Sequence, residues 1–298
     1  MSEVAGLDIK NCTVIGCGVM GFGIAVVLLN KGFNVTVVEK DESSLERGIN
    51  LIKKFYEAGI KRGKINEDEV KENLKRLKGT INLNEIPPDS LTIEVVNEEL
   101  KLKQEVLRKV EDIINEDNPI FTNTSSIPVI EIAASLRKPE RLIGFHFFNP
   151  PPVMKLIEVI PSKKTDERYI NFAVEFARFL GKEPVITKDT PAFIGNALLV
   201  PFILESIRMY ESGLASYEDI DKACKLGLGY PMGPFELADF MGLDIVLAIA
   251  DNVYDRTKDK RFAAPATLRE LVNAGNLGRK TGRGFYDYKK PKIFGVEM

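Results

Sequence analysis

Short apolar runs alternate with longer, charged segments over the first two thirds of the chain. The runs are rich in Val, Ile, Leu and Phe, and their length is typical of buried strands. They occupy residues 13–15, 34–38, 90–96, 119–121 and 142–148. Between them, residues 24–30 predict a helix that ends near Gly32, and residues 41–78 predict a pair of charged helices. Strands alternating with helices predict an α/β fold with a doubly wound, mainly parallel sheet that ends near residue 189.

The pattern becomes helical throughout after this point. Asp189 and Pro191 predict a helix start, and the apolar helix continues to Met209 with Asn196 about one and a half turns inside it. Glycine-rich turns separate further helical patterns, and only residues 284–288 resemble a strand. These helices are expected at residues 217–226, 234–240, 243–254 and 266–274. The sequence therefore predicts two domains, residues 1–189 and an all-helical domain of residues 190–298. Helices this apolar in a small domain indicate a buried homodimer surface.

Charge narrows the range of partners. The 41 Lys and Arg residues nearly balance the 43 Asp and Glu residues, giving a net charge of -2, so charge gives no general reason to expect nucleic acid or a membrane surface. A basic cluster in the predicted helix pair could be a solvated face or could meet a phosphorylated ligand. It comprises Lys53, Lys54, Lys61, Arg62 and Lys64. The basic run of residues 289–292 is expected to be solvated.

Cysteine usage and the chain ends favour a cytoplasmic protein. Cys12, Cys17 and Cys224 have no metal-ligand spacing, so no metal site is expected, and an odd number leaves one thiol unpaired in any disulfide scheme. The first ten residues are acidic and polar where a signal peptide would be basic and then apolar. No apolar run approaches the roughly 20 residues that a membrane span needs, and the final GVEM is not a peroxisomal or retention signal.

A glycine motif follows the first strand. In GCGVMG, Gly16 suits a tight turn, Gly18 lets the backbone approach a pyrophosphate, and Gly21 permits close packing of the helix on the strand. The second strand ends at Glu39, 23 residues after Gly16. An acidic side chain there accepts hydrogen bonds from a ribose 2'-hydroxyl, which favours NAD over NADP. The alternative is a solvated strand end.

The segment GFHFFNPPPVMKLIE, residues 144–158, contains His146, which is the only histidine of the chain. His146 lies on one apolar run, and Glu158 lies within the next, residues 153–160. Burying a carboxylate in MKLIEVI is costly unless it is paired, and the histidine on the neighbouring extended segment is a plausible partner. Such a pair makes an orientable general base. The alternative is a hydrogen-bonded core histidine.

Two further polar sites stand out. In TNTSS, residues 122–126, Ser126 with Pro128 predicts a helix N-cap, which leaves Ser125 to face a ligand at the carboxyl end of a strand or to act as a second capping hydroxyl. Asn196 lies in the apolar sequence FIGNALLV and needs partners for its amide. A neighbouring backbone group or a substrate oxygen could supply them.

Several motifs together resemble those of the 3-hydroxyacyl-CoA dehydrogenases, and within that family those of the stand-alone 3-hydroxybutyryl-CoA dehydrogenases. They cover the chain from about residue 11 to about residue 290 and are unusual in composition. The motifs are VIGCGVMG at 14–21, TNTSS at 122–126, GFHFFNPPPVMKLIEVI at 144–160, DTPAFIGN at 189–196, GYPMGPFELADFMGLDI at 229–245 and GRKTGRGFYDY at 278–288.

The resemblance implies an N-terminal NAD-binding Rossmann-type domain and a helical substrate and dimerisation domain. It implies reversible oxidation of an (S)-3-hydroxyacyl-CoA with NAD, with His146 as general base and Glu158 orienting its ring. Ser125 and Asn196 would bond the reacting end of the substrate, and Asn196 would place the site between the domains. The implied cofactor residues are Gly16, Gly18, Met20, Gly21, Glu39, Glu98, Lys103 and Ser125. The alternatives are a dehydrogenase of another small hydroxy acid and an NAD-binding sensor without turnover.

Overall fold

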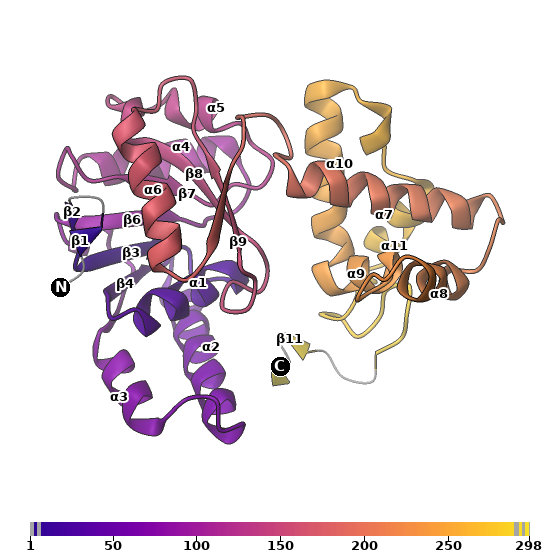
Figure 1. The fold of residues 1–298 in the computed structure, drawn as a ribbon, viewed down its shortest axis with the longest axis horizontal. Coiled ribbons are helices and arrows are strands. Elements are labelled where there is room, and N and C mark those ends of the chain that lie inside the picture. The colour runs from indigo at the N-terminus through magenta and orange to yellow at the C-terminus, as the bar shows by residue number, and fades with distance from the viewer. Residues whose placement is uncertain (1–2, 5–6, 289–291, 294–295, 298) are drawn as a thin grey trace. The chain divides into compact units, whose positions relative to one another are not determined.

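A computed structural model describes residues 3–4, 7–288, 292–293 and 296–297 (Figure 1). Residues 289–291 of the basic run lie outside the described residues. The chain divides into two compact units, Met1–Thr190 and Pro191–Met298. In the first unit, β1 (Glu3–Val4) and β2 (Leu7–Asp8) form a short hairpin ahead of the main sheet. In the second unit, β11 (Lys292–Ile293) and β12 (Val296–Glu297) form another.

The first unit is built on a sheet whose described strands follow the order β10-β9-β8-β7-β6-β3-β4-β5. These strands are β3 (Asn11–Ile15), β4 (Asn34–Val38), β5 (Leu77–Thr80), β6 (Ser90–Glu94), β7 (Ile120–Thr122), β8 (Leu142–Phe147), β9 (Leu156–Ile160) and β10 (Glu183–Ile186). The strands from β5 to β8 run parallel, whereas β9 is antiparallel to β8 and parallel to β10. The chain order reverses between β3 and β6, as it does in dinucleotide-binding sheets. The predicted doubly wound, mainly parallel sheet is confirmed.

Helices cover both faces of this sheet. Phe121 of β7 and Phe145 of β8 stack with ring centroids 4.4 Å apart, and both pack against Phe176 of α6. Gly144 precedes Phe145 and faces the opposite side, where an added Cβ would stand 2.8 Å from Val129 of α5. The helices of this unit are α1 (Val19–Asn30), α2 (Glu42–Lys61), α3 (Glu67–Lys75), α4 (Leu100–Glu111), α5 (Val129–Ala133) and α6 (Glu167–Phe179), with single 3-10 turns at Leu83–Glu85 and Pro139–Arg141.

The helices α2 and α3 form the expected charged pair, which projects from the sheet (Figure 1). The prediction that helix continues to residue 78 was wrong, because β5 begins at Leu77 and pairs with β4. The edge of β4 supplies the partners: the Val35 N–H donates to the Arg76 carbonyl and the Glu39 N–H to the Thr80 carbonyl. A Cβ at Gly79 would stand 2.7 Å from Ile49 of α2, so the glycine lets the helix lie close over this strand.

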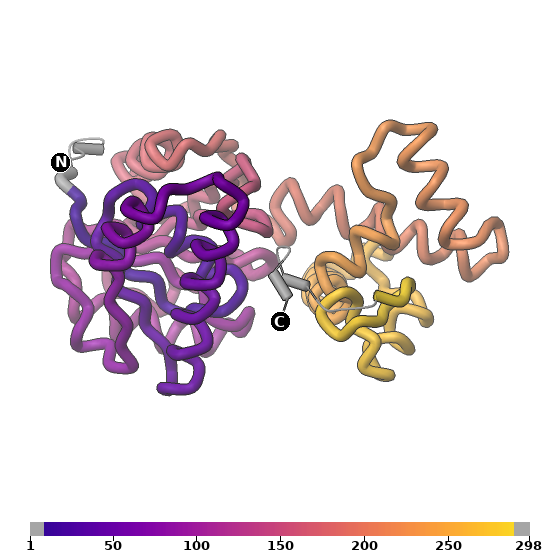
Figure 2. The backbone as a smooth tube through the Cα atoms, turned by 90° about the horizontal axis from the view of Figure 1, so that it is seen from below, coloured from indigo at the N-terminus to yellow at the C-terminus, as the bar shows by residue number. Residues whose placement is uncertain are grey.

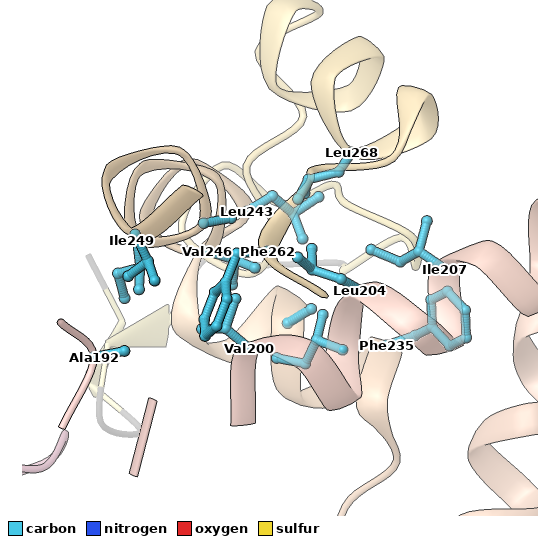
Figure 3. Close-up of a cluster of buried hydrophobic side chains, with 14 of the residues drawn as sticks. Ala192, Val200, Leu204, Ile207, Phe235, Leu243, Val246, Ile249, Phe262 and Leu268 are labelled. Atoms are coloured by element: carbon cyan, nitrogen blue, oxygen red, sulfur yellow. The ribbon is translucent and has the colours of Figure 1, made fainter. Parts of the chain in front are cut away.

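The second unit is helical in its described part, and the orange and yellow course in Figure 2 follows its successive helices. They are α7 (Gly195–Glu211), α8 (Tyr217–Gly227), α9 (Pro234–Met241), α10 (Leu243–Thr257) and α11 (Ala266–Asn273), with a 3-10 turn at Lys260–Phe262. Apolar side chains from these helices meet in one core, which includes Val200, Phe235, Val246 and Leu268 (Figure 3). The predicted all-helical character is confirmed. Residues 284–288 form no regular strand, and among them only Asp287 makes an isolated bridge, to Arg283.

The helix N-caps predicted at Asp189 and at Ser126 were both wrong. Asp189 does not cap its own helix; its two oxygens accept the N–H groups of Val129 and Ile130 at 2.7 Å and so cap α5. The Ser126 hydroxyl, expected to make that cap, instead lies 3.0 Å from Glu98. Positive φ at Ala192 (69°) delays α7 to Gly195, because this conformation does not continue a right-handed helix. Asn196 is therefore the second residue of α7 and not a residue well inside it.

Buried aspartates organise the end of the second unit. Asp221 accepts the N–H groups of Phe235 and Glu236 at the start of α9. Asp239 accepts the N–H groups of Phe285 and Tyr286, and a Cβ at Gly284 would stand 1.9 Å from it. The glycine-rich segment of residues 278–288 is thus folded onto α9 by a carboxylate that only glycine can approach. Among the described residues, none of the helices combines the length and apolar character needed to cross a bilayer.

Candidate active site

The glycine loop after β3 has the shape that a bound pyrophosphate requires. Gly16 has φ of 94°, and a Cβ at Gly21 would stand 1.8 Å from the Gly16 carbonyl oxygen, so neither position accepts a side chain. No described atom lies within 4 Å of the place that a Cβ at Gly18 would occupy. No described side chain caps the start of α1, where Met20 lies, so its N–H groups and dipole favour an anion. These residues fit a dinucleotide.

Glu39 stands at the carboxyl end of β4, beside this loop. One of its oxygens accepts the Cys17 N–H at 2.7 Å, and the other accepts the Lys40 N–H at 3.1 Å. The side chain is half-buried and is therefore fixed against the glycine loop instead of extending into solvent. The alternative of a merely solvated strand end does not describe it. A carboxylate held here fits the hydroxyls of a ribose.

His146 and Glu158 form a buried pair. They are directly opposite each other in the antiparallel register of β8 and β9, and His146 Nδ1 lies 2.8 Å from Glu158 Oε2. Their side chains are 8% and 1% exposed. The pairing expected from the two apolar runs is confirmed. With the carboxylate on Nδ1, proton exchange with a ligand falls to the other ring nitrogen, Nε2.

The turn after β8 is held in place by neighbours on both sides. Lys182 is 7% exposed, and its Nζ donates to the carbonyls of Pro151 at 2.6 Å and Met154 at 2.7 Å. A Cβ at Gly23 of α1 would stand 2.9 Å from Pro151. Asn149 lies in this turn, three residues after His146, and its Oδ1 is buried without a hydrogen-bond partner among the described residues. A buried acceptor of this kind fits a donor group of a ligand, and Asn149 was not among the predicted site residues.

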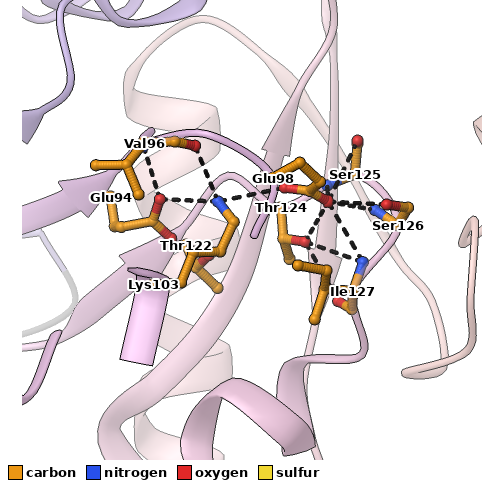
Figure 4. Close-up of polar contacts among 9 residues, drawn as sticks. All are labelled: Glu94, Val96, Glu98, Lys103, Thr122, Thr124, Ser125, Ser126 and Ile127. Atoms are coloured by element: carbon orange, nitrogen blue, oxygen red, sulfur yellow. Dashed lines mark hydrogen bonds and ion pairs between the residues drawn. The ribbon is translucent and has the colours of Figure 1, made fainter. Parts of the chain in front are cut away.

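The segment TNTSS gathers around one carboxylate. Glu98, after β6, has an oxygen 2.7 Å from Thr124 Oγ1, 2.8 Å from the N–H of Ser125 and 2.8 Å from the N–H of Ser126 (Figure 4). Burial opposes ionisation of Glu98, but Lys103 and these donors outweigh it and lower the pKa of the carboxyl to about 2. Glu98 is therefore an anion, and Ser125 stands half-buried on a loop that this anion orders.

Lys103 of α4 lies behind Glu98. Its Nζ is 2.8 Å from Glu94 and 3.3 Å from Glu98, and its side chain is 1% exposed. Burial lowers the pKa of Lys103, but the two carboxylates raise it further, so the net shift is upward. The family resemblance implied a role for Lys103 at the cofactor, and Glu94 was not among the predicted site residues. The signal for Glu94 was present, since a carboxylate inside the apolar run SLTIEVV raises the same question as Glu158.

The structure brings most of the predicted site residues to one edge of the sheet. Gly16, Glu39, Glu98 and Ser125 follow the carboxyl ends of four parallel strands, and His146 lies near the carboxyl end of a fifth. Ligands of open α/β sheets bind at this edge, at the point where the strand order reverses. Asn196 belongs to the second unit, where it is 5% exposed near the start of α7. The fold, the glycine loop and the buried acid–base pair define a dehydrogenase that binds a nicotinamide dinucleotide.

Comparison with known proteins identifies the family. Residues 11–190 match the NAD binding domain of 3-hydroxyacyl-CoA dehydrogenase, and residues 193–288 match the C-terminal domain of the same family. The chain belongs to the 3-hydroxyacyl-CoA dehydrogenase family.

Individual relatives agree over nearly the whole chain. The 3-hydroxybutyryl-CoA dehydrogenase of Mycobacterium tuberculosis is 41% identical over 94% of this chain and 99% of that protein. The mitochondrial hydroxyacyl-coenzyme A dehydrogenase of Homo sapiens is 40% identical over 94% of this chain and 92% of that protein. The crystal structure of (S)-3-hydroxybutyryl-CoA dehydrogenase PaaH1 from Ralstonia eutropha superimposes with a TM-score of 0.88 and 36% identity, covering 95% of this chain and 100% of that chain.

Proposed function

We propose that this protein interconverts an (S)-3-hydroxyacyl-CoA and the 3-ketoacyl-CoA with NAD, and that 3-hydroxybutyryl-CoA is its substrate. The observation that carries the proposal is the His146–Glu158 pair, buried at the same sheet edge as a dinucleotide loop. The family match supports the reaction and the cofactor. The names of the bacterial relatives support the short acyl chain.

In this proposal His146 is the general base. NAD, when bound, would accept the hydride that leaves C3 of the substrate. His146 Nε2 takes the proton of the 3-hydroxyl as the C–O bond becomes a carbonyl, and Glu158 stabilises the imidazolium that results. A positioned acid–base group of this kind is worth about 10²- to 10⁴-fold in rate. In the reverse direction the same imidazolium returns the proton to the carbonyl oxygen.

Ser125 and Asn196 are proposed to donate hydrogen bonds to the reacting oxygen, where negative charge develops. The proposal for Ser125 is supported by Glu98, which accepts the Ser125 N–H and would hold the residue at this edge of the sheet (Figure 4). Asn149 would also contact a bound ligand, because its Oδ1 is a buried acceptor without a partner among the described residues.

For the cofactor, Gly16, Gly18, Met20 and Gly21 would hold the pyrophosphate, and Glu39 the ribose hydroxyls, which favours NAD over NADP. Glu98 and Ser125 would lie at the nicotinamide end, because they follow the strands on the other side of the reversal point. Lys103 is enclosed, so its contribution would pass through Glu98.

The proposal also covers the role of each domain and the oligomeric state. Residues 1–189 would bind NAD, and residues 190–298 would bind substrate and form a homodimer. Several large apolar side chains of the second unit are exposed in the single chain, and sedimentation of the purified protein as a dimer would support their burial. They include Leu198, Leu214, Leu226 and Leu228. The cytoplasm is proposed as the compartment because Cys12, Cys17 and Cys224 are all buried free thiols.

The variant His146→Gln tests the assignment of the base. The amide occupies similar volume and keeps polar atoms, but it cannot accept a proton at neutral pH. We expect NADH affinity, measured by fluorescence titration, to stay within about twofold, and turnover with acetoacetyl-CoA to fall by at least about 100-fold. Turnover at the wild-type rate in this variant would contradict the assignment, and loss of NADH binding would indicate a structural role instead.

A further inference from the structure

Glu94 is a carboxylate that no ligand can reach. It is the last residue of β6 and is 0% exposed. One oxygen accepts the Val96 N–H at 2.8 Å and lies 2.8 Å from Lys103 Nζ, and the other accepts the Thr122 hydroxyl at 2.6 Å. A buried carboxylate is tolerated only when it is paired in this way. Glu94 is therefore fully engaged with the protein, at the ends of two adjacent strands.

Lys103 connects Glu94 to the surface of the site. Lys103 Nζ bridges Glu94 Oε1 and Glu98 Oε2, and it also donates to the Val96 carbonyl at 3.2 Å. Exposure rises along this sequence, from 0% for the Glu94 side chain and 1% for Lys103 to 29% for Glu98. One cation thus joins an enclosed carboxylate to one that reaches the ligand edge of the sheet (Figure 4).

Glu98 orders the loop that contains Thr124, Ser125 and Ser126. Its Oε1 accepts the Thr124 hydroxyl and the N–H groups of Ser125 and Ser126, and the Ile127 N–H lies 3.3 Å away. Several donors on one oxygen fix a short loop more firmly than its own backbone could. The position of Ser125 therefore depends on where the Glu98 carboxylate stands.

We propose that Glu94 is a positioning residue of the active site, which acts on Ser125 through Lys103 and Glu98. Glu94 holds the ammonium of Lys103 from below, so that Glu98 is left with one oxygen on the lysine and one for the loop. Without the Glu94 charge, the buried ammonium has one carboxylate left to neutralise it, and Glu98 is drawn away from the loop. The inference rests on the proposed function, since that function gives Ser125 its contact with the ligands.

Amide hydrogen exchange tests this connection without any turnover. In Glu94→Gln, which keeps the size but removes the charge, the amides of Ser125 and Ser126 should exchange about tenfold faster or more, because they lose the Glu98 acceptor that protects them. Glu111→Gln is the matched control. Glu111 is a buried carboxylate on α4, the helix that carries Lys103, and it accepts the N–H groups of Arg137 and Lys138. Loss of its charge should leave exchange in residues 122–128 unchanged.

Unchanged exchange at Ser125 and Ser126 in Glu94→Gln would overturn the proposal, and so would equal acceleration in the Glu111→Gln control. If Glu94→Gln does not fold, the comparison is made on Glu94→Asp. That variant keeps the charge and withdraws it by one methylene, so intermediate acceleration at the same amides is expected. Wild-type exchange at these amides in Glu94→Asp would likewise overturn the connection.

Kinetics then test whether the displacement matters to the reaction. With acetoacetyl-CoA and saturating NADH, kcat of Glu94→Gln should fall about 10- to 100-fold, the range expected when a catalytic group is misplaced. Lys103→Met and the double variant Glu94→Gln/Lys103→Met should lose about the same as each other, because the two residues act in series. Losses that multiply would overturn action through Lys103. A wild-type protein without turnover would refute the proposed function alone, since the exchange result stands apart from it.

Discussion

Replacing Glu158 with Gln is the perturbation that isolates the charge of the buried pair. The two side chains have similar shape, and the strand register that places residue 158 opposite His146 is set by backbone bonds. An amide can still hydrogen-bond Nδ1, but it no longer offsets the positive charge that the ring acquires when it takes the substrate proton. The expected effect is therefore on the rate of the reaction and not on the fold of the β8–β9 hairpin.

The size of the expected rate loss follows from the distance between the two charges and from their burial. Opposite charges about 4 Å apart attract by about 4 kcal/mol at an effective dielectric constant of about 20. A neutral hydrogen bond retains roughly half of what a charge-assisted one supplies, so the net loss is about 2 to 4 kcal/mol. Each 1.4 kcal/mol is about a factor of ten in rate. Turnover should therefore fall between about 30-fold and 1,000-fold.

The assay is steady-state oxidation of NADH by acetoacetyl-CoA, with NADH affinity measured separately by fluorescence. We expect kcat to fall by the stated factor while NADH affinity remains within about twofold of wild type, because Glu158 is 1% exposed and does not reach a ligand. A loss of less than about threefold would refute the claim that the Glu158 charge stabilises the imidazolium. A parallel loss of NADH affinity would show that the hairpin itself had moved.

Three other changes test separate parts of the structure. In Gly21→Ala the added Cβ would stand 1.8 Å from the Gly16 carbonyl, so NADH should bind at least about tenfold more weakly by fluorescence titration; unchanged affinity would contradict the loop geometry. In Asp189→Ala the first two N–H groups of α5 lose their acceptor, and urea unfolding should show about 1 to 2 kcal/mol less stability, with Asp189→Asn in between. The pKa of Glu98 falls from 4.5 in the unfolded chain to about 2, so its stabilisation is present above pH 4.5 and is lost as pH falls towards 2; Glu98→Gln should show a shallower acid loss of thermal stability.

The strands of the first unit could be predicted because their local signals agree with the final fold. Residues 35–38 are all β-branched, and the predicted run of residues 34–38 becomes β4 with the same bounds. The strand β5 was missed because LKGT, residues 77–80, has no strand pattern of its own and forms by pairing with the edge of β4. Local sequence decides the first case, and a distant partner decides the second.

The errors at helix starts have the same origin. Asp189 and Pro191 look like the start of a helix, yet the Asp189 carboxylate binds the start of α5, sixty residues earlier in the chain. Nothing in the residues around Asp189 indicates that a helix end with unsatisfied N–H groups lies beside it. Ser126, the cap expected there, bonds Glu98 instead. Several side chains are able to cap a helix, and the tertiary fold determines which of them does so.

Within the site, the pairing of His146 with Glu158 could be predicted because two apolar runs separated by a short turn tend to pair, and each run contains one residue that needs a partner. Glu94 was missed although it gives the same signal, because its partner Lys103 lies on a helix and not on the next strand. Asn149 was missed because its importance lies in an acceptor that the described residues leave unsatisfied. That property exists only in the folded chain.

The most direct test of the account is the oxidation of NADH, and separately of NADPH, by acetoacetyl-CoA with the purified wild-type protein, followed by absorbance. We predict rapid turnover with a clear preference for NADH, because the Glu39 carboxylate, held at the end of β4, would accept ribose hydroxyls and repel a 2'-phosphate. A preference for NADPH would keep the reaction and contradict the assignment of Glu39. Binding of NADH without turnover on acetoacetyl-CoA or longer 3-ketoacyl-CoA substrates would contradict the central claim.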